Sequence, residues 1–226
     1  MFTITTDLNH SDIGQVLKLA RANYVELISK SVRPHGPTSS LCIAQVEAEV
    51  REYLRDALTG CYGLPVEAVL AKEPVTGDVI GFAIVLGGNI PTDCGINYAA
   101  VHVDHRRQGI LREMLNHVKS RHTHIGLSCN VDKVPFYEAL GFRITGADLV
   151  QVAMCWGLDN PGASMGVLDF GQNAEVNEAK DTFLRINGQK AQSILSKIGH
   201  IQEQRIVYVQ GYVEKRQAGL SHTSAL

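Results

Sequence analysis

The sequence contains few cysteines and no long hydrophobic run. Its 226 residues include 5 cysteines, which are widely spaced and form no C-x-x-C pair. Neither a disulfide framework nor a zinc ribbon fits them, so a reducing compartment is favoured. No run of about 18 apolar residues occurs, and the amino terminus lacks the basic start and apolar core of a secretion signal. We therefore expect a cytoplasmic protein with no membrane partner.

The sequence also lacks an excess of charge of either sign. Lysine and arginine number 21 against 23 aspartate and glutamate, which gives a formal net charge of -2. This balance argues against broad electrostatic capture of nucleic acid and leaves room only for a local basic patch. Hydrophobic residues make up 45% of the chain, which is ordinary for a globular protein and too high for a disordered one. The length suits one large domain or two small ones.

Apolar periodicity predicts strands and helices in alternation. The strands are expected at 2–6, 66–71, 79–86, 96–103, 125–130 and 142–156, the last with a break near 146–148. The helices are expected at 13–28, at 41–58, from Gly109 onward and at 135–140. This order predicts a mixed α/β sheet with helices on its faces, in one domain of residues 1–156.

A C-terminal extension, residues 157–226, follows a glycine-containing link. Its first part has helical periodicity from Val176 to Ile198, and Gly188 weakens the middle by about 1 kcal/mol relative to alanine, which favours a bend. The run from Arg205 to Val213 is rich in β-branched and aromatic residues and predicts a strand. We therefore expect a helix-strand extension that packs on the core or on a second subunit, the latter making a homodimer.

The stretch from Val101 to Leu115 is the most informative for chemistry. A predicted strand turns through a basic, glycine-containing bend directly into a helix. The first turn of a helix has unpartnered N–H groups and the positive end of the helix dipole. Gly109 lets a ligand approach the main chain, and Arg106 and Arg107 add positive charge. A diphosphate suits this site, although the spacing matches neither the P-loop nor the dinucleotide-binding glycine motif.

Two motifs resemble those of the GNAT (GCN5-related N-acetyltransferase) superfamily. The first, Arg106-x-x-Gly109-x-Leu111, is similar to the family's Q/R-x-x-G-x-G/A at a helix start and departs from it at Leu111. The second, N-V-D-K-V-P-F-Y-E-A-L-G-F from Asn130 to Phe142, resembles N-x-x-A-x-x-L-Y-E-K-L-G-F, with Lys133 replacing an alanine. The resemblance implies a GNAT-like acyltransferase fold, α/β with a mixed, mostly antiparallel central sheet flanked by helices.

The resemblance also implies a cofactor, acetyl-coenzyme A, held between two splayed strands. Main-chain groups of Val101 and Val103 would bond the pantetheine arm, and the amides from Gln108 to Arg112 would hold the pyrophosphate. The residues assigned in this way to the cofactor are Val101, Val103, Arg106, Arg107, Gln108, Gly109, Ile110, Leu111, Arg112, Asn130 and Tyr137. A main-chain N–H on the first strand would stabilise the oxyanion formed during transfer.

Tyr137 aligns with the tyrosine that many members use as general acid toward the departing thiolate, a role that requires its hydroxyl to reach the sulfur. No matching residue identifies the general base. His102 is a candidate because it follows Val101 on the strand nearest the thioester, and strand alternation allows it to face the cleft or the helix layer. His35, Asn97 and Tyr98 are alternatives, as is proton loss to water.

The sequence thus predicts an N-acetyltransferase that moves an acetyl group to a primary amine of a small molecule or protein by direct attack in a ternary complex. The histidine pairs 102/105 and 122/124 lack further ligands at suitable spacing, so no metal is expected. The alternative is a GNAT-fold protein that binds coenzyme A but acts mainly by binding and modulating a partner protein. The extension and the unusual Leu111 and Lys133 motivate that alternative.

Overall fold

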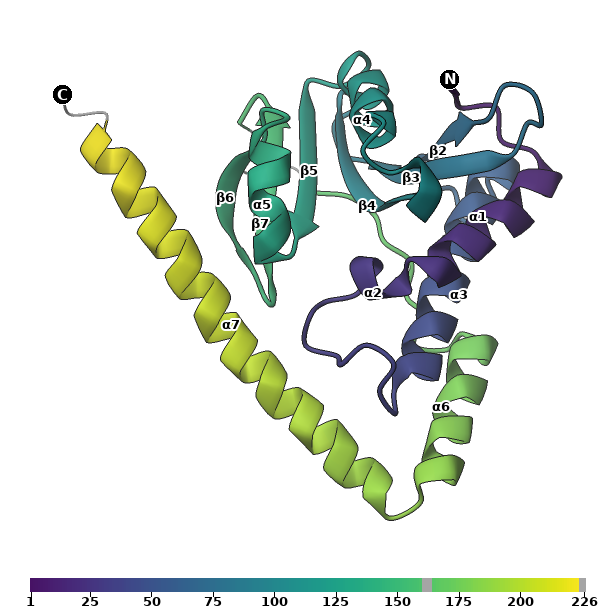
Figure 1. The fold of residues 1–226 in the computed structure, drawn as a ribbon, viewed down its shortest axis with the longest axis vertical. Coiled ribbons are helices and arrows are strands. Elements are labelled where there is room, and N and C mark those ends of the chain that lie inside the picture. Colours follow the sequence, from purple (N-terminus) through teal and green to yellow (C-terminus); the bar gives the residue numbers. More distant parts are fainter. Residues whose placement is uncertain (160–163, 224–226) are drawn as a thin grey trace.

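A seven-stranded sheet forms the centre of the protein in our computed structural model, which describes residues 1–159 and 164–223 (Figure 1). The strand order is β1-β2-β3-β4-β5-β7-β6, and β4 and β5 are parallel whereas the other neighbouring pairs are antiparallel. The strands are β1 Thr3–Thr5, β2 Val66–Lys72, β3 Val79–Gly87, β4 Asp93–Val101, β5 His124–Cys129, β6 Arg143–Asp148 and β7 Gln151–Gly157. The predicted mixed, mostly antiparallel sheet is confirmed.

Helices cover both faces of the sheet and extend beyond it (Figure 1). They are α1 His10–Ala22, α2 Tyr24–Leu27, α3 Ser39–Thr59, α4 Ile110–Lys119, α5 Val134–Glu138, α6 Ala174–Asn187 and α7 Lys190–Thr223, with 3₁₀ turns at Val103–His105 and Val131–Lys133. One core cluster joins α1 and α3 to the sheet, and the other joins α4 and the end of α7 to the opposite face. Across the described ranges, no helix is both long and apolar enough to cross a membrane.

Local signals explain where the first helices begin and end. The Asn9 side chain accepts hydrogen bonds from the N–H groups of Ser11 and Asp12, and Asp12 accepts one from the Asn9 N–H at 3.0 Å. This capping box fixes the start of α1. Gly60 ends α3 with a left-handed φ of 62°, a conformation that glycine adopts without steric cost.

The strand predicted at 96–103 occupies Asp93–Val101 instead, so the placement of His102 and Val103 on it is wrong. The His102 N–H still donates to the Ile80 carbonyl at 2.8 Å, but its ring caps the following 3₁₀ turn by accepting from the Asp104 N–H at 3.3 Å. A short polar cap of this kind competes with the sheet ladder and ends the strand.

The extension contains two helices and no strand at 205–213, so the helix-strand prediction is half wrong. The bend at Gly188 is confirmed, because this residue separates α6 from α7. Val209 and Val213, four residues apart, are both buried in the core cluster on the α4 face. The apolar run therefore serves one helical face rather than alternating sides of a strand.

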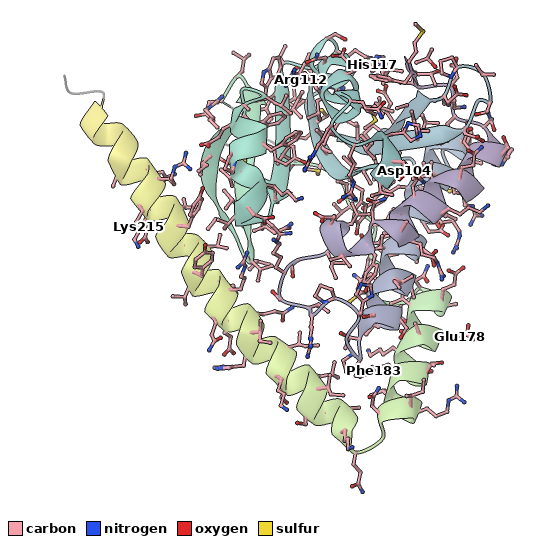
Figure 2. The ribbon with its side chains drawn as sticks, viewed as in Figure 1. Asp104, Arg112, His117, Glu178, Phe183 and Lys215 are labelled. Carbon is pink, nitrogen blue, oxygen red and sulfur yellow. The ribbon has the colours of Figure 1, made fainter. Side chains whose placement is uncertain are left out.

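Figure 1 shows α6 lying along α3 and α7 running diagonally from the turn after α6 toward β6. Phe183 on α6, labelled in Figure 2, is fully buried. Near the other end of the extension, Arg216 donates to Glu138 of α5 at 2.5 Å. The extension is thus attached to α3 through α6 and to α5 through the second half of α7.

Candidate active site

The parallel strands β4 and β5 separate partway along their length. They pair only from Asp93–Ile96 to His124–Leu127. Beyond these rungs, β4 continues beside β3 to Val101, and β5 continues beside β7 to Cys129. The edges that face each other across the gap therefore present main-chain groups that no neighbouring strand pairs, which an extended ligand with amide groups can bond as an added strand would.

A β-bulge lies where the two strands begin to separate. Ile84 of β3 pairs with Tyr98, and the next residue, Val85, pairs with Ile96. Asn97 is the extra residue, so it lies outside the ladder and bends β4 away from β5. Asn97 is exposed and lines the cavity described below. A main-chain N–H released from the ladder at this point is suited to bind an oxyanion.

The predicted glycine-containing bend lies at the start of α4. Gly109 has a φ of 82°, and a Cβ built on it meets no atom within 4 Å. Arg107 also has positive φ, 64°, a conformation uncommon outside glycine. The first amides of α4, at Ile110 and the two residues after it, follow directly and have no partner within the helix, and these residues line the cavity described below.

The side chains of Arg106, Arg107 and Arg112 differ in their contacts and exposure. Arg106 donates to the side-chain oxygen of Asn23 at 2.5 Å and to the Val101 carbonyl at 3.4 Å, which fastens the bend to α1 and β4. Arg107 and Arg112 are exposed, and Arg112 is labelled on α4 in Figure 2. These two side chains line the cavity described below and leave positive charge at its surface.

A single cavity of about 1350 Å³ connects the bend, the gap between the strands and α5. It brings together most of the predicted cofactor residues, namely Val101, Arg106, Arg107, Gly109, Ile110, Leu111, Arg112, Asn130 and Tyr137. Gln108, Val103 and His102 are not among its lining residues. Leu111, the residue that departs from the family motif, also packs partly against the core on the α4 face.

Tyr137 of α5 lies at the cavity wall next to the rings of Phe136 and Phe142, whose centroids are 5.2 and 5.7 Å away. Burial, with a smaller contribution from the nearby Cys129, raises the pKa of Tyr137 to about 12. The phenol therefore keeps its proton at neutral pH and remains a donor, as a general acid must.

Cys129 does not have the properties of a nucleophile. Burial raises the pKa of its thiol to about 12, and its sulfur lies 3.7 Å from the Met154 sulfur inside the core. A reactive cysteine requires a thiolate, which this environment disfavours. The environment of Cys129 is that of a buried structural thiol.

Asn130 is buried and bonds the segment after α2. Its side-chain oxygen accepts from the Lys30 N–H at 3.3 Å, and its amide donates to the Ile28 carbonyl at 3.3 Å. Two ion pairs join the same parts of the chain: Lys30 with Asp132 at 2.8 Å, and Lys133 with Glu26 at 2.5 Å. Lys133, unusual for the motif, thus closes one side of the cavity.

The candidate bases differ in position. His35 is exposed and lies against Tyr24, whose hydroxyl accepts from the His35 N–H at 3.0 Å, and it does not line the cavity. Tyr98 does line it and donates to a Glu49 carboxylate oxygen at 2.7 Å. Burial, followed by the Glu49 charge, raises the pKa of Tyr98 far above its usual value. A phenol held neutral in this way is a donor rather than a base.

Sequence reasoning missed two contributions to this cavity. Met165 and Val167, from the segment that leads to α6, line it beside β4 and β5. The ion pair between Glu26 and Lys133 was also not predicted. Both depend on contacts between distant segments and leave no local pattern in the sequence. Among the described residues, no group of three or more histidine, cysteine or acidic side chains is arranged to hold a metal.

Comparisons with known proteins agree with this geometry. The family description "Acetyltransferase (GNAT) domain" matches residues 66–144, which span β2 to β6. A search of curated proteins by sequence gives no match. The matched residues include both strands of the gap, the bend and Tyr137.

Solved structures show the same fold. A PaiA N-acetyltransferase from Thermoplasma acidophilum, in complex with coenzyme A, is 15% identical, with a TM-score of 0.51 over 70% of this chain and 99% of that one. A GNAT-family acetyltransferase from Staphylococcus aureus is 14% identical, with a TM-score of 0.50 over 70% of this chain and 100% of that one. At these identities the likeness concerns the fold.

Proposed function

We propose that this protein is an N-acetyltransferase that takes the acetyl group of acetyl-coenzyme A and passes it to a primary amine of a small molecule or protein. One observation carries the proposal. A strand gap suited to an amide-containing arm, a left-handed bend suited to a diphosphate, and a protonated tyrosine all line one cavity.

The cofactor would lie along β4. Its diphosphate would accept hydrogen bonds from the amides around Gly109 and Ile110, with charge supplied by Arg107 and Arg112. The pantetheine amides would pair with main-chain groups of β4 from Ala99 to Val101. The thioester would then reach the bulge at Asn97, where a main-chain donor is typically worth about 3 kcal/mol of barrier.

Transfer would proceed by direct attack within the ternary complex. The amine nitrogen forms a bond to the thioester carbon, the carbon–sulfur bond breaks, and the departing thiolate takes the proton of Tyr137. Because the Cys129 thiol is buried and its pKa is about 12, we propose no acyl-cysteine intermediate. The amine loses its proton to water in the cavity, and water returns a proton to the Tyr137 phenolate, which restores the acid. His102 is not assigned this role because it lies outside the cavity lining.

Release of the coenzyme A thiol in the presence of a panel of amines and peptides tests the proposal. We expect thiol release that depends on the amine, with an acetylated product of matching mass. Tyr137→Phe should lower turnover far more than it weakens coenzyme A binding, because it removes one hydroxyl and keeps the ring. An acetylated product formed equally well by the Tyr137→Phe variant would refute the acid role, and binding without turnover for every amine would refute the activity.

The alternative function, binding of a partner protein, is favoured by one feature of α7. This helix exposes Leu195, Ile201, Val207 and Tyr208, which are between 37% and 69% accessible. Such side chains occur at protein interfaces, including those of homodimers. Protein binding that survives Tyr137→Phe and leaves no acetyl group on the bound protein would support this alternative over the enzyme.

A further inference from the structure

Two glycines face each other at the point where β4 and β5 separate. Gly95 pairs with Gly126, and the next rung, Ile96 with Leu127, is the last before the gap. Ile96 and Leu127 belong to the core cluster on the α4 face. Because side chains alternate along a strand, both glycines face the opposite side, toward α1 and α3. The absence of two neighbouring side chains leaves a hollow there.

Met165 fills one side of this hollow. A Cβ built on Gly95 would lie 2.0 Å from the Met165 Cε and 2.4 Å from its Sδ, so the thioether rests directly on this glycine. A Cβ on Gly126 would meet nothing closer than 3.9 Å. Met165 is 40% accessible and lines the cavity, as does Gly126. The thioether therefore forms a wall of the cavity at the vertex of the gap.

Hydrogen bonds on both sides of Met165 fix its position. Before it, the Asn89 N–H donates to the Ser164 carbonyl at 2.8 Å, and the Ser164 N–H donates to the Asn89 side chain at 3.1 Å. Met165 itself forms a bridge with Gly88. After it, the Leu168 N–H donates to the Tyr53 hydroxyl at 3.2 Å. This segment belongs to the C-terminal extension, so the extension supplies a wall of the candidate active site.

We propose that Met165 limits the length of the acyl chain that the protein accepts, and so selects acetyl over longer acyl groups. The inference rests on the proposed function. With the diphosphate at Gly109 and the arm along β4, the thioester carbonyl reaches Asn97 and the acyl carbons continue toward the vertex. Met165 occupies the space into which carbons beyond the first two would extend.

The test compares Met165→Ala with Met165→Leu. Alanine removes the thioether from Gly95, whereas leucine is close to methionine in volume and serves as the matched control. The readout is kcat/KM for acetyl-, propionyl- and butyryl-coenzyme A with one amine. A methylene in an apolar pocket is worth about 10- to 200-fold in discrimination, so Met165→Ala should raise the butyryl-to-acetyl ratio at least about tenfold. Met165→Leu should leave it near the wild-type value.

A second readout separates this inference from the proposed function. Calorimetry with S-ethyl- and S-butyl-coenzyme A, which are thioethers and do not react, measures chain-length preference without turnover. Met165→Ala should strengthen S-butyl binding and leave unmodified coenzyme A unchanged. An inactive protein that shows this shift would refute acetyl transfer and retain the role of Met165. The role of Met165 alone would be overturned if the wild type, Met165→Ala and Met165→Leu were all active and had the same butyryl-to-acetyl ratio of kcat/KM and the same S-butyl affinity.

Discussion

The clearest perturbation of the bend places a negative charge at Gly109. This residue has a φ of 82° and open space where a Cβ would be, so asparagine and aspartate can both be introduced without a steric clash. Both residues tolerate the left-handed conformation better than other side chains do. They also have the same shape, so Gly109→Asp compared with Gly109→Asn isolates the effect of one charge beside a bound diphosphate.

The magnitude follows from Coulomb's law. A carboxylate about 6 Å from each of two phosphate charges is repelled by about 1.4 kcal/mol in total at the dielectric of bulk water, and by several times more at the effective dielectric near a protein surface. Since 1.4 kcal/mol is a factor of ten in affinity, Gly109→Asp should bind coenzyme A at least about tenfold more weakly than Gly109→Asn at low salt.

Titration calorimetry at two ionic strengths measures this difference. The gap between the two variants should shrink in concentrated salt, because the screening length falls from about 10 Å at 0.1 M to about 3 Å at 1 M. Pantetheine, which lacks the diphosphate, should not distinguish the variants and is the ligand control. Equal coenzyme A affinities for the two variants at low salt would refute the placement of the diphosphate at this bend.

Further predictions concern the general acid Tyr137, helix α7 and the start of α1. Tyr137→Phe should reduce kcat by about 10²- to 10⁴-fold, the usual contribution of a general acid, with a far smaller change in the Kd for coenzyme A by calorimetry. Because burial raises the pKa of Tyr137 to about 12, loss of its proton should cause no decline of the wild-type rate between pH 8 and about 10 in a pH–rate profile; a decline that vanishes in Tyr137→Phe would contradict this. Val209→Asp places an unpaired carboxylate in the core and should speed hydrogen exchange along the end of α7, whereas Val207→Asp, at an exposed position, should not. Asn9→Ala should cost about 1 kcal/mol, which lowers Tm by about 2–4 °C; an unchanged melting temperature would show that the capping box contributes nothing.

The sequence was sufficient for the elements that local patterns encode. The strands β2 and β3 and the bend at Gly109 that opens α4 each depend on a few neighbouring residues. The order of these elements then limited the sheet to a mixed α/β arrangement. Local patterns and the order of the elements were therefore enough to predict the sheet and the bend that surround the candidate site.

The sequence-based predictions failed where contacts between distant parts of the chain, rather than local propensity, determine the structure. The run from Arg205 to Val213 has high β propensity, but Val209 and Val213 pack on the core as one face of a long helix, and such packing outweighs propensity. His102 was placed by strand alternation, which fails one residue beyond the end of β4. Met165 reaches Gly95 across some seventy residues of chain, a contact that no short motif encodes.

The most direct test of the account is a crystal structure of the protein with bound coenzyme A. We predict that the pantetheine arm lies between β4 and β5 and that the diphosphate lies on the main-chain amides that begin α4. A structure in which the Leu111 side chain blocks the bend, or in which the coenzyme lies outside the gap between the two strands, would contradict it.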